Sequence, residues 1–292
     1  MSSVNIFWDP AGISLDTLLG NKFIRTKDGD TPVVSMSIRM LSIDTPETTD
    51  SASNQNKSLK QLATWIKEKK APIKNELADH LLPKLDSGQA GTLQKNQGKQ
   101  ATVYFKELLE KKLTKPNGDK RDLFLRAADE HFDQYGRLLS YLAPKYSYEE
   151  LESMSLKDRA TFNLLMVDSG WAASFPIYPS IPKYSDLRLL REAAKDAIEN
   201  KRGAWANQLS LTGYEYRMCK RLYSTTKKMV VDGDPMYGSR RYDWISRYCV
   251  DMMDRRIYYP QDYYMVEPFN RIFIWPKDVV EAVAKMNLIP AY

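Results

Sequence analysis

The 292-residue sequence is poor in histidine and cysteine, with only His80, His131, Cys219 and Cys249. Two isolated histidines argue against a histidine-centred catalytic triad and against a multi-histidine metal site, and each is predicted to be structural or solvated. Two cysteines do not make a disulfide framework, and reduced thiols fit a reducing compartment. Any acid–base or metal chemistry must therefore rest on carboxylates.

The sequence also lacks a hydrophobic run long enough to span a membrane. Its first ten residues have neither the basic segment nor the apolar segment of a signal peptide, so we expect a cytoplasmic protein without membrane contact. The formal net charge of +6 and the pI near 9.0 favour a polyanionic partner such as nucleic acid. A basic protein without such a partner has the same composition.

The most informative stretch is residues 36–48. Its first half alternates apolar and polar side chains, as a half-buried strand does, and a proline then ends the strand because it cannot donate to a ladder. The break leaves Arg39, Asp44, Glu47 and the carbonyl of Thr45 at the end of a rigid element. Hard oxygen ligands beside a guanidinium suit a divalent cation and a phosphate, although a surface salt bridge beside a turn has the same pattern.

This stretch resembles the catalytic strand of the staphylococcal nuclease family, in which an arginine precedes Asp-Thr/Ala-Pro-Glu. Residues 133–142 give a second match, Asp-x-Tyr-Gly-Arg followed by an alternating strand. Residues 163–207 give a third: a short helix, Ser-Gly-Trp-Ala, a tyrosine-bearing loop and a charged helix closed by Gly-Ala-Trp. The three motifs stand in the family order and cover about residues 1–207.

The resemblance implies an α+β fold with a five-stranded OB-type barrel and packed helices in residues 1–207. Strands are expected at 4–8, 16–26, 33–43, 123–127 and 138–142, and helices at 100–112, 161–167 and 185–202. An Asp-Gly pair within residues 27–30 predicts a hairpin turn. Ser147 and Glu150 predict a capping box.

Residues 50–98 are an insertion relative to the family. Apolar side chains at helical spacing predict two helices there, closed by a loop at residues 87–98. The lysines of the insertion either contact phosphates or form a solvated face. The helix at 100–112 is expected to turn Val103, Tyr104, Leu108 and Leu109 inward.

Residues 208–292 form an extension in which tyrosines alternate with arginines and lysines. Stacking rings and cations that pair with phosphates are typical of nucleic-acid surfaces. Trp244, Tyr248, Met252 and the apolar run at 272–275 are equally suited to a small core. The extension is therefore predicted either to bind nucleic acid or a protein partner, or to be structural or oligomerising.

The resemblance implies a Ca²⁺ site formed by the carboxylates of Asp16 and Asp44 and the carbonyl of Thr45. Oxygen-only ligation is what calcium prefers. Asp30 is the alternative to Asp16, because it too precedes a threonine. The metal-binding aspartate and Arg39 must lie at the same end of an antiparallel pair. The expected turn falls midway between Asp16 and Arg39, so Asp16 is predicted and Asp30 is second.

For catalysis, the resemblance implies that Glu47 activates the attacking water while Arg39 and Arg137 bind the scissile phosphate. The residues expected to bind the substrate are Asp133, Tyr135 and Tyr178. The family has a second tyrosine two positions earlier, where this sequence has Pro176. Phe175 is the candidate to supply that ring.

Two functions follow. The first is a Ca²⁺-dependent hydrolase of phosphodiester bonds in DNA, RNA or both. The second is a catalytically silent OB-fold module that binds nucleic acid or protein. A silent module need not retain Arg39, Asp44, Glu47 and Arg137, and all four are present, so we predict the enzyme. A toxin or defence effector whose extension docks a partner is a variant of the first function.

Overall fold

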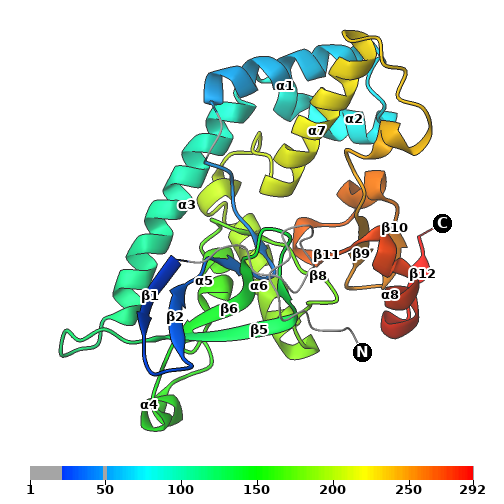
Figure 1. The fold of residues 1–292 in the computed structure, drawn as a ribbon. Helices are drawn as coiled ribbons and strands as arrows, with labels where there is room; N and C mark the ends of the chain where they lie inside the picture. Colours follow the sequence, from blue (N-terminus) through cyan, green and yellow to red (C-terminus); the bar gives the residue numbers. More distant parts are fainter. Residues whose placement is uncertain (1–21, 49–50, 292) are drawn as a thin grey trace.

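The computed structural model describes residues 22–48 and 51–291. Helices and strands are mixed along the chain, which confirms the α+β class. Figure 1 shows the long helix α3 running beside a β-rich part and up to a helical part that contains α1, α2 and α7. The predicted strand at 4–8 and the candidate ligand Asp16 lie outside the described residues.

The predicted hairpin is present. Strands β1 (Lys22–Thr26) and β2 (Pro32–Ser35) pair antiparallel, and the Lys27 N–H donates to the Thr31 carbonyl (3.0 Å) across the turn. The expected continuous strand at 33–43 is wrong, because it is divided into β2, β3 (Ile38–Met40) and β4 (Ile43–Asp44). The second break falls where Ser42 adopts a left-handed backbone with φ of 59°, which no strand accommodates.

Three further strands surround the β3–β4 segment. Strand β3 pairs parallel with β6 (Leu138–Pro144), and β6 pairs antiparallel with β5 (Leu123–Phe132). Strand β4 pairs antiparallel with β7 (Ala173–Ser174). These strands lie in separate short sheets within the described chain, where no closed barrel is seen, so the five-stranded barrel stays a prediction.

The insertion is helical, as predicted, but its boundary differs. Its helices are α1 (Ala52–Lys67), α2 (Asn75–Asp86) and α3 (Ala90–Leu113). The predicted loop at 87–98 is wrong, because α3 begins at Ala90 and continues through it. Gly91 and Gly98 do not break this helix. A Cβ on Gly91 would lie 2.6 Å from the Cβ of Gln55, so the glycine permits close packing against α1.

The predicted helices at 161–167 and 185–202 are present as α5 (Phe162–Asp168) and α6 (Tyr184–Glu199), the second ending three residues early. The structure also has α4 (Tyr148–Ser153) and a 3₁₀ turn, η1 (Gly203–Ala206). Ser147 and Glu150 form the expected capping box. One inward position was wrong. Val103 on α3 is 54% exposed, whereas Leu108 packs partly buried beside the core of α5 and α6.

The extension adds helix α7 (Gly213–Val230) and most of a five-stranded sheet. The sheet order is β12-β10-β9-β11-β8, with β8 (Ile177–Tyr178), β9 (Tyr248–Asp251), β10 (Arg256–Tyr258), β11 (Arg271–Ile274) and β12 (Ile289–Pro290). The other elements are η2 (Gly238–Tyr242), η3 (Pro260–Met265), η4 (Pro268–Asn270), η5 (Pro276–Asp278) and α8 (Val279–Met286). Because β8 precedes residue 207, the extension completes a sheet begun in the first part.

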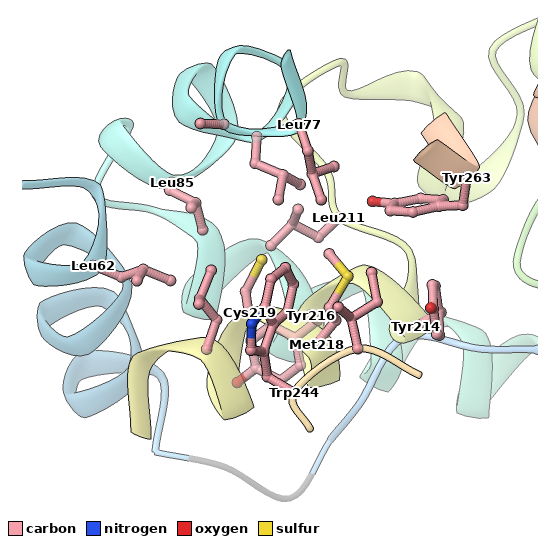
Figure 2. Packing of buried hydrophobic residues seen from close by; sticks show 14 of the residues in the cluster. Leu62, Leu77, Leu85, Leu211, Tyr214, Tyr216, Met218, Cys219, Trp244 and Tyr263 are labelled. Atoms are coloured by element: carbon pink, nitrogen blue, oxygen red, sulfur yellow. The ribbon is translucent and has the colours of Figure 1, made fainter. Parts of the chain in front are cut away.

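The insertion and the extension share one hydrophobic core. Figure 2 shows Leu62, Leu77 and Leu85 from the insertion facing Cys219 and Trp244 from the extension. All five side chains are at most 1% exposed. The indole of Trp65 on α1 also stacks on the ring of Tyr223 on α7, with centroids 5.5 Å apart. Neither segment buries its apolar face without the other.

Candidate functional site

The strand end at Asp44 brings a carboxylate and a guanidinium together. Strand β4 pairs with β7 through Asp44 and Ala173, which leaves the Asp44 carboxylate only 1% exposed. The guanidinium of Arg39 on β3 lies 3.4 Å from Asp44 Oδ1 and 3.5 Å from the Ile43 carbonyl. Two residues of the predicted site therefore meet as the motif requires.

A third arginine, which the sequence did not single out, binds both carboxylates of the site. Arg217 on α7 places Nη2 at 2.8 Å from Asp44 Oδ1 and Nη1 at 2.6 Å from Glu47 Oε1. Burial lowers the pKa of Arg217, but the carboxylates of Asp44 and Glu47 outweigh it and raise the pKa overall. The guanidinium is a permanent charge that joins the two acids.

The start of α7 lies directly against the strand end. A Cβ on Gly213, the first residue of that helix, would be 2.5 Å from the Thr45 carbonyl oxygen and 2.6 Å from Asp44 Oδ2. Real Cβ atoms do not approach oxygen so closely, so this position requires glycine. The two oxygens border the same small space beside the backbone of residue 213.

Helix α3 fixes the backbone around Glu47. A Cβ on Gly98 would be 2.7 Å from the Glu47 carbonyl oxygen, so the helix axis passes close to the strand end. Gln94 is 1% exposed, and with its amide oriented to satisfy both neighbours it accepts from the Glu47 N–H (2.8 Å) and donates to the Leu211 carbonyl (3.1 Å). One buried side chain therefore ties the strand end to the segment that leads into α7.

The donor set suits a hard cation. Within the described chain, Asp44 Oδ2 is buried without a hydrogen-bond partner, and it borders the same space as the Thr45 carbonyl. A carboxylate and a carbonyl oxygen are ligands that Ca²⁺ prefers. No three Asp, Glu, His or Cys side chains gather at a metal-binding distance in residues 22–48 and 51–291. Asp16, the predicted third ligand, is outside those ranges.

Asp30, the alternative ligand, lies in the turn of the β1–β2 hairpin. Its carboxylate accepts from the Thr31 hydroxyl at 3.1 Å. Residue Ser35, at the opposite end of the hairpin, leads into β3 and Arg39. Asp30 and Arg39 are therefore reached from opposite ends of the same strand pair, as the sequence argument for Asp16 requires.

The loop between β5 and β6 is shaped by Asp133. Its carboxylate accepts from the backbone N–H of Tyr135 (2.9 Å) and of Arg137 (3.0 Å), and Gly136 takes the positive φ of 70° that the turn needs. The Arg137 guanidinium donates to Asp133 Oδ2 at 2.6–2.7 Å. Burial raises the pKa of Asp133, but these bonds to Arg137 and Tyr135 lower it overall.

The strand register relates the two predicted phosphate-binding arginines. Arg39 pairs with Leu139 in the parallel β3–β6 ladder, and Arg137 precedes Leu139 by two residues. Arg137 therefore lies just before β6 begins, next to the end of that strand that pairs with β3. The structure thus brings Arg39, Asp44 and Glu47 together and places Arg137 in the turn directly before the neighbouring strand β6.

The predicted nucleotide contacts divide into exposed and buried residues. Tyr135 is 61% exposed, with the Arg137 guanidinium 5.3 Å from its ring. Tyr178 is 5% exposed and packs in the core of the C-terminal sheet with Val250. Phe175 is also 5% exposed and packs against Tyr214 in the core that the insertion and the extension share. Both rings are therefore buried in cores and are not open to a nucleotide, whereas Tyr135 is.

The chain belongs to the family of staphylococcal nuclease homologues, whose model matches residues 37–207. The match begins just before β3 and ends at η1, so it contains Arg39, Asp44, Glu47 and Arg137. Helix α7, with Gly213 and the third arginine, lies beyond it. No curated protein matches the chain. In the part of the chain that the structure describes, no helix has the length and apolar character needed to cross a bilayer.

Membership of this family favours a nuclease-type function with nucleic acid as the partner. Arg217 and Gly213 are the site residues that the sequence analysis missed. Their one available signal is the capping box Thr212–Glu215, which marks the start of α7 but not its neighbours.

Proposed function

We propose that the protein is a Ca²⁺-dependent phosphodiesterase that hydrolyses DNA, RNA or both. The observation that carries this proposal is the meeting of Asp44, Glu47 and Arg39 at the end of β4, with an unpartnered carboxylate oxygen facing a carbonyl. Phosphodiester hydrolysis needs an activated water and positive charge around the phosphoryl oxygens. The residues in and beside β3, β4 and β6 provide a base and several cations.

Glu47 is the proposed general base, accepting the proton of the attacking water. Its side chain is 33% exposed, so water reaches it. Arg39 and Arg137 bind the non-bridging oxygens of the phosphate, which they do best as bidentate forks. A substrate phosphate also competes with Glu47 for the guanidinium of Arg217, and this exchange would release Glu47 Oε1 for its role as base.

Asp44 Oδ2 and the Thr45 carbonyl are the described groups that would hold Ca²⁺, with Asp16 proposed to complete the set. A bound Ca²⁺ would supply positive charge that neutralises the phosphoryl oxygens. Glycine at position 213 leaves room beside both oxygens, where any larger residue would fill the space.

The alternative is a silent module that binds nucleic acid without cleaving it. The observation in its favour is that Arg217 already neutralises both Asp44 and Glu47 in this structure. A module that only binds its partner would be stable with these ion pairs permanently made. The two functions differ in turnover and not in binding.

Labelled single- and double-stranded DNA and RNA, incubated with Ca²⁺ or EGTA, test the proposal. We expect Ca²⁺-dependent cleavage that falls by roughly 10²–10³-fold in Glu47→Gln, since a lost transition-state contact costs about 3–4 kcal/mol. Glu107→Gln, on the exposed face of α3, is the matched control and should retain activity. Binding without cleavage of any of the four substrates would favour the silent module.

Calcium titration also decides between the two candidate aspartates. Asp16→Ala is expected to weaken calcium binding more than Asp30→Ala, because Asp30 lies at the turn end of the hairpin. A larger loss in Asp30→Ala would show that the proposed ligand set is wrong.

A further inference from the structure

A cleft of about 570 Å³ runs along α7, outside the residues that match the family. Its lining residues come from α7 and from the segment around η2: Arg217, Lys220, Arg221, Ser224, Thr225, Lys228, Met236, Arg240, Asp243 and Trp244. Five of these side chains are cations and one is an anion. We call this surface the cationic cleft.

The cations follow one face of α7. Counted from Arg217, the next cations on the helix come three, four and eleven residues later, at Lys220, Arg221 and Lys228. These spacings place all four on one side of the helix. Eleven residues of helix rise by about 16 Å. At about 3.4 Å per nucleotide along one strand of a duplex, that length corresponds to roughly five phosphates.

Two of these charges have no acidic partner. Arg221 and Lys228 are exposed, and neither forms an ion pair with an acid in the described ranges. Arg240, across the cleft, has only a long 3.5 Å contact with Asp234. An exposed pair at that distance contributes little, so this charge also remains open to a ligand.

A smaller pocket lies at the inner end of the cleft, where three arginines converge. Arg217, Arg221 and Arg247 line it together. The Arg247 guanidinium lies 4.0 Å from the ring centroid of Trp275, and its Nε is buried without a hydrogen-bond partner in the described chain. Burial, reinforced by the charge of Arg217, lowers the pKa of Arg247 to about 10. This pocket has a volume of only about 10 Å³, room for about one water, so its arginines add positive charge at the end of the cleft and do not form a separate anion site.

We propose that the cationic cleft binds the sugar–phosphate backbone of a nucleic-acid strand and leads it to the Asp44–Glu47 site. The inference rests on the proposed function, because it names where the same substrate binds beyond the scissile phosphate. Arg217 connects the two regions, since it lines the cleft and contacts both carboxylates. Arginine forks match phosphate oxygens in pairs, and a strand supplies phosphates at regular spacing.

Binding is measured without turnover, in the Glu47→Gln background and without divalent cations, by anisotropy of a labelled single-stranded oligonucleotide. Arg221→Gln/Lys228→Gln should weaken binding roughly tenfold at moderate salt. The slope of log Kd against log salt should fall by about 1.4, since each lost phosphate contact removes about 0.7 for a single strand. Arg240→Gln, on a different element, should shift both quantities in the same direction.

Lys106→Ala/Lys111→Ala is the matched control, because it removes two exposed charges from α3 and should leave affinity and slope unchanged. Unchanged binding in both cleft variants would overturn the proposal that the cleft binds nucleic acid, even if the wild-type protein cleaves DNA or RNA. A wild-type protein that binds through the cleft without any hydrolysis would support the cleft and contradict the proposed function. If polyglutamate displaces the labelled oligonucleotide as effectively as unlabelled oligonucleotide does, the nucleic-acid proposal is overturned in favour of an acidic protein partner.

Discussion

Asp44 explains why an arginine from the distant extension belongs to this site. A carboxylate that is 1% exposed must be compensated by an opposite charge. Arg39, its neighbour in the motif, is 3.4 Å away, whereas Arg217 is 2.8 Å away. The closer counter-charge therefore comes from α7. A bound Ca²⁺ would compensate the same carboxylate, so either the arginine or the metal can neutralise the charge of Asp44.

Arg217→Ala is expected to make stability depend on calcium. Without metal, the buried Asp44 carboxylate loses its closest partner, and the free energy of unfolding should fall by about 3 kcal/mol. Saturating Ca²⁺ should restore part of that loss, because the metal binds only the folded state. Urea unfolding with Ca²⁺ and with EGTA measures both effects.

Arg217→Lys keeps the charge and serves as the control for this experiment. It should lose less stability in EGTA than the alanine variant and gain less from calcium. If calcium stabilises Arg217→Ala and the wild-type protein equally, the cation does not bind at Asp44.

The sequence predicted the local part of this site and not the distant part. Arg39, Asp44 and Glu47 fall within nine residues, and the strand-then-proline pattern alone places them at one strand end. Arg217 lies 170 residues beyond Glu47 and is one of many basic residues in the extension. Only the packing of α7 against the strand end selects it. That packing depends on Gly213, whose role appears only when its neighbours are known.

At the scale of elements, α7 is fixed by a buried acid in its first turn. Glu215 is 2% exposed and accepts from Lys84 (3.1 Å) and His80 (3.4 Å) on α2 and from the Tyr263 hydroxyl (3.1 Å) on η3. Burial raises the pKa of Glu215, but Lys84, His80 and Arg271 hold it well below its usual range overall. One carboxylate therefore joins the insertion to two elements of the extension.

Glu215→Gln should lower stability at neutral pH by about 3 kcal/mol, because Lys84 loses its buried partner. A carboxylate with a lowered folded-state pKa stabilises the protein above its unfolded pKa of about 4.3, and this contribution is lost as the pH falls further. The wild-type free energy of unfolding should therefore decrease steeply below about pH 4, and the variant should decrease less.

Urea unfolding across the acid range, with Glu107→Gln as an exposed control, measures the difference. The curves of the wild-type protein and of Glu215→Gln should converge as the pH falls. A constant offset at every pH would show that the loss is one of packing and not of charge.

The elements themselves were predictable where their signals were local. The hairpin turn, the capping box at Ser147 and the strands β5 and β6 all follow from short-range patterns. The start of α3 was not predictable in this way: a loop was predicted at 87–98, whereas the helix begins at Ala90 and contains two glycines. Glycine lowers helix propensity, but here it lets α3 approach α1 and the strand end closely. Tertiary packing overrides the local preference at those two positions.

At the scale of the whole molecule, the tyrosine-rich composition of the extension suited either a binding surface or a core. The structure contains both kinds of tyrosine, at different positions. Among its tyrosines, Tyr214, Tyr216 and Tyr263 are at most 7% exposed, whereas Tyr237 and Tyr259 are more than half exposed. The sequence could not sort them, because burial there depends on α1 and α2, which lie far away along the chain. The shared core is a tertiary property that no short pattern records.

Removal of residues 208–292 tests how far the molecule depends on this shared core. Truncation after Asn207 uncovers the fully buried faces of Leu62, Leu77 and Leu85 together. Each large apolar side chain that loses its cover costs about 2–5 kcal/mol, so the sum approaches the whole stability of a typical domain. We therefore expect the truncated chain to aggregate or to unfold without cooperativity, as size-exclusion chromatography and denaturant unfolding will show.

A second variant that also lacks residues 51–89 removes both apolar faces at once and should be more soluble than the truncation alone. A monomeric, cooperatively folded truncation would contradict the shared core and leave the extension as a binding module only.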